Sequence, residues 1–119
     1  MVLHDRITKR ETESINKYFN ELQEYDVLTP EEEHELSMMS YEGDLNARNK
    51  LIKHNLRFVI SVAKQFRDYE VKVEDLINEG NIGLIKAAER FDPTRGFRFI
   101  SYAVYWIRQS IMQSLNDNS

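Results

Sequence analysis

Apolar residues recur at helical spacing through most of this chain, and this periodicity restricts the fold more than any other feature. Residues 45–67 give the plainest example, because their apolar positions lie on one side at about 100° per residue. These positions are Ile52, Leu56, Val59, Val62, Ala63 and Phe66. Residues 12–24, 73–90 and 100–115 have comparable patterns, and no strand-like alternation interrupts them. The pattern predicts an all-α fold, a compact bundle of about five helices.

Capping and turn residues mark the ends of the helices. Residues 29–32 read Thr-Pro-Glu-Glu, which combines a threonine N-cap, a proline at the first helical position and a capping-box glutamate. This helix should end near Gly43, and we assign the acidic pair Glu32 and Glu33 to its start, where negative charge offsets the helix dipole. Residues 92–96 read Asp-Pro-Thr-Arg-Gly, which predicts a turn. The chain has only four glycines and two prolines, too few for the turns of a β-sandwich.

The formal net charge of −4 hides an uneven distribution. Residues 11–45 carry −10, whereas residues 46–72 carry +5 and residues 80–119 carry +2. Because a polyanion responds to the local field, a basic segment can bind phosphates beside an acidic one. The alternative is that the charged runs are solvated helix faces. Composition therefore leaves the partner open.

Several classes of protein are excluded by what the sequence lacks. The chain has no cysteine, which excludes disulfides and thiolate metal sites. Its longest apolar run covers five residues, 103–107, whereas a membrane helix needs about 18, so no membrane partner is expected. His4, His34 and His54 lie far apart, and there is no glycine-rich phosphate loop. We expect no enzyme, with no catalytic residues, no metal and no cofactor.

The helix predicted over residues 100–115 has an unusual outer side. Its core stripe consists of Ile100, Val104, Ile107, Ile111 and Leu115. The opposite arc carries Tyr102, Trp106, Gln109 and Gln113, with Tyr105 and Met112 beside it, where a surface helix would carry lysine and glutamate. One interpretation is that a further helix covers these aromatics, although the two glutamines would then need buried partners. The other is that the arc binds a ligand.

Aromatic residues are concentrated just before and within this helix, among arginines. Six of the thirteen aromatic residues are Phe91, Phe97, Phe99, Tyr102, Tyr105 and Trp106, and the neighbouring arginines are Arg90, Arg95, Arg98 and Arg108. Rings interleaved with guanidinium groups suit single-stranded nucleic acid, because bases stack on the rings and arginine holds phosphates. Phe91 also continues the apolar stripe of the preceding helix, and for this residue we favour a core role.

The helix predicted over residues 73–90 has two distinct sides. Its core stripe includes Gly80 and Gly83, which cost helix propensity and therefore indicate close approach of a neighbouring helix. The other side carries Asp75, Asn78, Glu79, Ile82, Ile85, Lys86 and Glu89. Two isoleucines surrounded by polar groups fit a protein-interaction surface, but scattered surface isoleucines are also common. Periodicity leaves both interpretations open.

Longer motifs resemble a known family. Residues 75–93 read DLINEGNIGLIKAAERFDP, residues 95–103 read RGFRFISYA, residues 106–109 read WIRQ and residues 55–59 read NLRFV. Together they resemble bacterial RNA polymerase sigma factors of the sigma-70 class, most closely the primary (housekeeping) type, over regions 1.2 to 2.4. The resemblance implies an N-terminal extension at 1–13, region 1.2-like helices at 14–54 and region 2 helices at 55–119, packed as one domain.

The resemblance also implies functional residues and partners. Residues at positions that recognise and melt the promoter −10 element are Asn55, Phe91, Asp92, Arg95, Phe97, Arg98, Phe99, Ser101, Tyr102, Tyr105, Trp106, Arg108 and Gln109. Residues at positions that bind the β′ clamp coiled coil of the polymerase core are Asn55, Arg57, Asp75, Asn78, Glu79, Asn81 and Ile85. The implied partners are core polymerase, the single-stranded non-template −10 region and an anti-sigma protein. The implied location is the cytoplasm, with the nucleoid reached through the polymerase.

Within this resemblance, a non-template adenine is expected to flip into a pocket, and a second flipped base is expected near Asn55. The residues expected to form the adenine pocket are Arg95, Phe97, Tyr102, Tyr105 and Gln109. The chain departs from the family pattern at Tyr105, where a second tryptophan is usual, and at Met112 and Gln113, where threonine and arginine are usual. Family members continue beyond the position of Ser119, so we expect a domain fragment of a longer sigma factor. The alternative function is a module that occupies the polymerase clamp without reading DNA.

Overall fold

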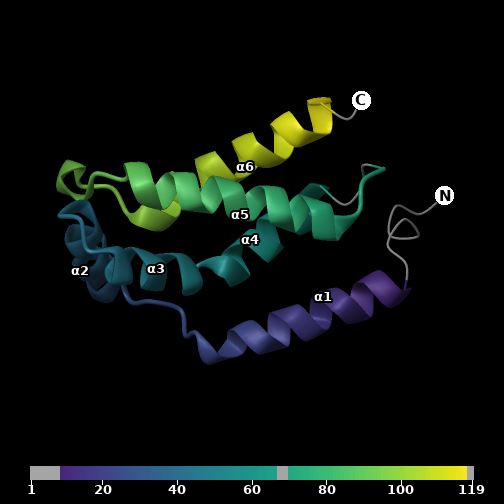
Figure 1. Cartoon of the computed structure of the whole chain (residues 1–119), viewed down its shortest axis with the longest axis horizontal. Helices are drawn as coiled ribbons and strands as arrows, with labels where there is room; N and C mark the ends of the chain where they lie inside the picture. Colours follow the sequence, from purple (N-terminus) through teal and green to yellow (C-terminus); the bar gives the residue numbers. More distant parts are fainter. Residues whose placement is uncertain (1–8, 67–69, 118–119) are drawn as a thin grey trace.

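A computed structural model describes residues 9–66 and 70–117, and Figure 1 shows how their helices are arranged. Within these ranges every regular element is a helix, the helices are joined by short loops, and there is no strand. The elements are α1 (Lys9–Glu21), η2 (Leu22–Glu24), α2 (Pro30–Tyr41), α3 (Leu45–Lys53), α4 (Leu56–Ala63), η3 (Lys64–Phe66), α5 (Val73–Arg90), η4 (Pro93–Arg95) and α6 (Phe99–Asp117). The predicted all-α fold is confirmed.

The prediction of one continuous helix over residues 45–67 is wrong, because the chain bends at Asn55 into α3, α4 and η3. The backbone of Asn55 leaves the helical range at φ −114° and ψ 2°. Its Nδ2 donates a 2.7 Å hydrogen bond to the carbonyl oxygen of Leu51, the acceptor that the residue's own N–H would use in an unbroken helix. That N–H donates instead to Ile52. The described ranges therefore hold six α-helices rather than about five.

The predicted start of α2 is confirmed. The hydroxyl of Thr29 accepts from the backbone N–H of Glu32 at 3.1 Å, and the Glu32 carboxylate accepts from the N–H of Thr29 at 2.9 Å. These hydrogen bonds hold the pKa of Glu32 below its ordinary value, the larger effect coming from the Thr29 backbone. At the far end the chain turns through Gly43 at φ +103°, and Asp44 caps α3 by accepting from the N–H of Ala47.

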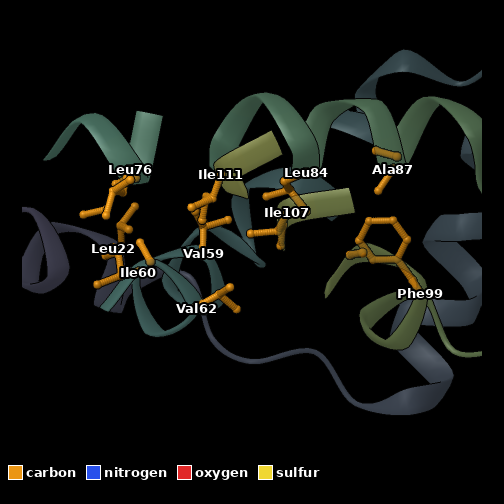
Figure 2. Close-up of a cluster of buried hydrophobic side chains, with 14 of the residues drawn as sticks. Leu22, Val59, Ile60, Val62, Leu76, Leu84, Ala87, Phe99, Ile107 and Ile111 are labelled. Atoms are coloured by element: carbon orange, nitrogen blue, oxygen red, sulfur yellow. The ribbon is translucent and has the colours of Figure 1, made fainter. Parts of the chain in front are cut away.

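Helices α5 and α6 form an antiparallel pair, with α5 across the middle of the view in Figure 1 and α6 at its upper edge. A Cβ atom on Gly83 would lie 2.8 Å from the Cα of Ile107, so only glycine allows the two backbones to approach this closely. A Cβ atom on Gly80 would likewise meet close neighbours, but these are the side chains of Val59 and Ile107 rather than backbone. The close packing predicted from the two glycines is thus confirmed, and Figure 2 shows Leu84 beside Ile107 in the resulting core.

The first helices share this core. Ile15 and Leu22 are buried, and Figure 2 shows Leu22 beside Ile60 and Leu76. The α3–α4 bend is fixed to the segment before α2, because Nδ1 of His54 donates to the carbonyl oxygen of Asp26 at 2.7 Å. These contacts connect the N-terminal helices to the α5–α6 pair.

Across the described parts of the chain, no helix combines the length and the apolar character that a membrane crossing requires.

Candidate functional site

The chain reverses direction between α5 and α6 through a short, highly structured loop. Asp92 begins η4 by accepting from the N–H and the hydroxyl of Thr94, at 2.9 and 2.6 Å. Pro93 occupies the first position, and Gly96 closes the turn in the left-handed region at φ +82°. The predicted turn is confirmed, and it leaves Arg95 and Phe97 exposed next to the start of α6.

The hydrogen bonds from Thr94, with a smaller contribution from Arg95, hold the pKa of Asp92 below its ordinary value of 3.8. A carboxylate whose pKa is lowered by folding stabilises the folded loop above its unfolded pKa, and this contribution is lost as the pH falls through the folded pKa. In an NMR titration we therefore expect the Thr94 amide resonance to move with a midpoint below 3.8. Asp92→Asn should abolish this titration, and a midpoint at or above 3.8 would contradict the assignment.

A connected series of aromatic rings leads from the core to the surface of α6. Phe91 and Phe99 are buried with ring centroids 5.3 Å apart, and Phe91 also lies 5.4 Å from the half-buried Tyr102. The ring centroids of Tyr102 and Trp106 lie 6.1 Å apart, and those of Trp106 and Tyr105 lie 5.9 Å apart in an edge-to-face arrangement. We call the exposed and half-exposed members of this region the aromatic surface: Arg95, Phe97, Tyr102, Tyr105, Trp106 and Gln109.

The outer side of α6 is not covered by another described helix. Tyr105 is 58% exposed, and Gln109, Met112 and Gln113 are also exposed. This result overturns the interpretation in which α6 is buried all round, and it removes the need for buried partners of the glutamines. Ser101 is exposed as well, at the edge of the same side.

Two arginines lie beside the aromatic surface with defined contacts. The guanidinium of Arg90 lies over the Trp106 ring, 4.8 Å from its centroid, in cation–π geometry. The indole Nε1 of Trp106 is buried and has no hydrogen-bond partner among the described residues. Arg108 donates to the side-chain oxygen of Gln65 at 2.8 Å, which connects α6 to η3. Arg90 and Arg108 therefore border the surface on two sides.

The side chain of Glu33 departs from the role that the sequence suggested. Glu33 lies in the first turn of α2, as predicted, but its carboxylate is buried and turned toward the start of α6. It accepts from the backbone N–H of Phe99, from that of Ile100 at 3.4 Å, and from the Arg98 guanidinium at 2.6 Å. Sequence offered no signal for these contacts, because they join residues more than sixty positions apart.

Three of the residues predicted to bind DNA are buried, and one residue predicted to bind the polymerase core packs against α1. Phe91 lies in the core, as favoured from its pattern, and Phe99 is only 1% exposed. Asn55 is buried at the α3–α4 bend, with its amide donor engaged by Leu51. The guanidinium of Arg57 lies over the ring of Phe19 in α1, 5.3 Å from its centroid.

A second surface lies on the outer face of α5. Its members are Asp75, Asn78, Glu79, Ile82 and Ile85, with Lys86 and Glu89 on the same side. Asn81, also predicted to bind the polymerase core, is half-buried, and its Oδ1 is buried with no hydrogen-bond partner among the described residues. Ile82 and Ile85 are 46% and 43% exposed, and the polar residues surround them. The described part of the chain therefore leaves an apolar centre with an acidic rim uncovered, and we call it the α5 face.

A groove of about 310 Å³ lies between the α5 face and the outer side of α6. It is lined by Glu79, Ile82 and Lys86 from α5 and by Ser110, Gln113 and Asp117 from α6, among others. Ser110 and Asp117 belong to no apolar or aromatic pattern, so nothing in the sequence marks them as groove residues. Within residues 9–66 and 70–117, no three histidine or acidic side chains are grouped so that they could hold a metal ion.

Comparison with known proteins adds independent information. Residues 51–119 match the family description Sigma-70 region 2, and residues 13–45 match Sigma-70 factor, region 1.2. The RNA polymerase sigma-C factor of Myxococcus xanthus is 47% identical over 106 residues, which make up 89% of this chain and 36% of that protein. RNA polymerase sigma factor SigA of Clostridium acetobutylicum is 44% identical over 105 residues, or 88% of this chain and 28% of that protein. The chain thus spans about a third of the length of these curated relatives.

Proposed function

The chain belongs to the sigma-70 family of transcription initiation factors, and from this premise we propose that it binds the RNA polymerase core through the α5 face and reads the promoter −10 element through the aromatic surface. The exposed part of this surface carries the proposal: Phe97, Tyr105 and Gln109 are exposed, whereas the rings of Tyr102 and Trp106 pack partly against the core. No step of the proposal is catalytic. The free energy of binding the unpaired strand offsets the cost of opening the duplex.

The aromatic surface supports strand reading through its chemistry. Each base that stacks on an aromatic ring contributes on the order of 1–3 kcal/mol. Gln109 offers both a donor and an acceptor to a base edge, and Arg95 supplies a positive charge for a phosphate. Buried Phe91 packs against both buried Phe99 and Tyr102, so the ring of Tyr102 is supported from the core.

We propose that a base flipped out of the duplex binds among the residues of the aromatic surface. Extracting a base from the duplex costs a few kcal/mol, which one or two aromatic stacks and a hydrogen-bonded edge offset. In this proposal Arg95, Phe97, Tyr102, Tyr105 and Gln109 receive a non-template adenine. Phe91, Phe99 and Asn55 act through packing instead, because all three are buried.

The α5 face supports the proposed contact with the β′ clamp. An apolar centre within a polar rim is the usual anatomy of a protein–protein interface, and Ile82 and Ile85 provide that centre. The acidic rim favours a basic partner surface. The proposal extends to an anti-sigma protein as a competitor for this face, and to action with the polymerase in the bacterial cytoplasm.

Two substitutions should separate the proposed contacts. Tyr105→Ala should weaken binding of a single-stranded −10 oligonucleotide by about 5- to 150-fold in the presence of core polymerase, because it removes one stacking ring. Ile85→Ala should weaken binding to core by about tenfold or less and leave DNA selectivity unchanged. Photo-crosslinking of the oligonucleotide, together with a titration of labelled chain with core, measures both effects. Met39→Ala, at an exposed position of α2, is the control and should change neither.

The same experiment tests the alternative function. If base-scrambled single strands crosslink as well as the −10 strand when core is present, the chain does not read the promoter. A module that only occupies the clamp would also tolerate Tyr105→Ala without loss. Loss of core binding in Tyr105→Ala, rather than in Ile85→Ala, would overturn the assignment of the two surfaces.

A further inference from the structure

A single buried carboxylate of α2 organises the start of α6. The side chain of Glu33 is only 6% exposed and receives the N–H groups of Phe99 and Ile100, the first two residues of α6. These two donors have no partner within an α-helix, so Glu33 acts as a cap supplied by another element of the fold. Negative charge at this helix end also complements the dipole. Figure 1 shows α2 at the same end of the bundle as the α5–α6 turn.

The same carboxylate neutralises one of the arginines beside the aromatic surface. Its second oxygen accepts from Arg98 at 2.6 Å, and the Arg98 side chain remains 49% exposed. Arg98 therefore faces solvent, but its charge is paired with an acid buried beneath it. A phosphate that attracted Arg98 away would leave a buried carboxylate without its counter-charge, which is strongly unfavourable.

We propose that Glu33 is a positioning and specificity-determining residue: it fixes the start of α6 and withholds the charge of Arg98 from sequence-independent phosphate binding. The inference rests on the proposed function, because it concerns how the aromatic surface selects its strand. Affinity that comes from phosphates is blind to sequence, whereas base stacking and edge contacts are selective. Pairing Arg98 with Glu33 lowers the phosphate contribution to strand affinity, so base stacking and edge contacts make up a larger share of it.

Glu33→Gln separates the two roles, because an amide oxygen can still accept from the N–H of Phe99 but the charge opposite Arg98 is gone. The 119-residue chain carrying this substitution should bind an oligodeoxythymidine 15-mer about fivefold more tightly at low salt. Its plot of log affinity against log salt concentration should steepen by about 0.7, the value for one additional phosphate contact on a single strand. Its preference for the −10 strand over a scrambled strand should fall. Glu35→Gln, an exposed carboxylate of the same helix, is the matched control and should leave the slope unchanged.

Arg98→Met provides a second test, and in the otherwise unsubstituted chain its result does not depend on how well the Glu33 variant folds. In the unsubstituted chain it should leave the oligodeoxythymidine salt slope unchanged, because Arg98 makes no phosphate contact there, although the unpaired carboxylate of Glu33 should lower the stability of the fold. In the Glu33→Gln background it should return both slope and affinity to their original values. A slope that falls by about 0.7 on Arg98→Met alone would overturn the inference, as would an unchanged slope in a folded Glu33→Gln chain.

These outcomes are distinct from failure of the proposed function. Oligodeoxythymidine lacks the −10 sequence, and the salt dependence of its affinity reports phosphate contacts rather than base stacking. Its salt slopes therefore test the Glu33–Arg98 pair whether or not the chain selects a promoter sequence. If the unsubstituted chain with core binds −10 and scrambled strands equally, the proposed function fails. If that preference exists but Glu33→Gln preserves it together with the original salt slope, only the role of Glu33 fails.

Discussion

Replacing Gly83 by alanine is expected to lower the free energy of unfolding by about 2–3 kcal/mol, even though alanine is the better helix former. The new Cβ would lie 2.8 Å from the Cα of Ile107 and against the backbone carbonyl of Trp106. Because the obstacle is backbone, α6 can relieve the clash only by moving as a unit away from α5. Urea unfolding followed by circular dichroism measures the loss.

Gly80→Ala is the comparison, since it introduces the same methyl group into the same helix. Its nearest neighbour is Cγ1 of Val59 at 2.6 Å, the end of a side chain rather than backbone. The loss should therefore be smaller than for Gly83→Ala, at about 1 kcal/mol. Equal losses at the two positions, or a gain at Gly83, would contradict the close approach of α5 and α6. Movement of α6 should also weaken strand binding in the Gly83 variant, because Tyr102, Tyr105 and Trp106 are all on that helix.

Phe97 and Phe99 are two residues apart, and we expect opposite consequences from their replacement by alanine. Phe99 is fully buried against Phe91, so Phe99→Ala should cost about 3–5 kcal/mol of stability. Phe97 is 65% exposed, so Phe97→Ala should change stability by less than about 0.5 kcal/mol. Within the proposed function, Phe97→Ala should still weaken binding of the −10 strand by about 5- to 150-fold.

Thermal unfolding and oligonucleotide titration with core polymerase, carried out on both variants, distinguish the two roles. A stable Phe99→Ala chain would contradict the placement of this ring in the core. Normal strand binding by a folded Phe97→Ala chain would remove Phe97 from the proposed pocket. The wild-type chain and Met39→Ala serve as references, because Met39 is exposed on α2 and takes no part in the aromatic surface.

Much of the local structure could be predicted because its causes are local. The capping box at Thr29 and Glu32 involves residues three apart, and the turn at residues 92–96 depends on its own proline and glycine. Helical periodicity also predicted the exposed positions of α6 at Tyr105, Gln109, Met112 and Gln113, whereas Tyr102 and Trp106, predicted on the same side, pack partly against the core. In these cases the atoms that decide the outcome lie within one or two helical turns.

The bend at Asn55 was missed, although its cause is also local. The apolar stripe continues through residues 45–67, and periodicity cannot show that one amide side chain takes the acceptor of its own backbone N–H. Phe97 and Phe99 pose a related difficulty. Both lie in one aromatic stretch, and only the direction in which the chain leaves the Gly96 turn decides that one ring is exposed and the other buried.

By itself the sequence determined the all-α class, the capped start of α2 and the residue types available on α5 and α6, because these depend on spacing and capping along the chain. Only the tertiary structure decided which arginine is paired and which helix end is capped from elsewhere. Glu33 reaches Arg98 and the start of α6 across more than sixty residues, a contact created by packing α2 against the α5–α6 pair. Such a contact has no period and no local signature, so it exists only once the core has formed.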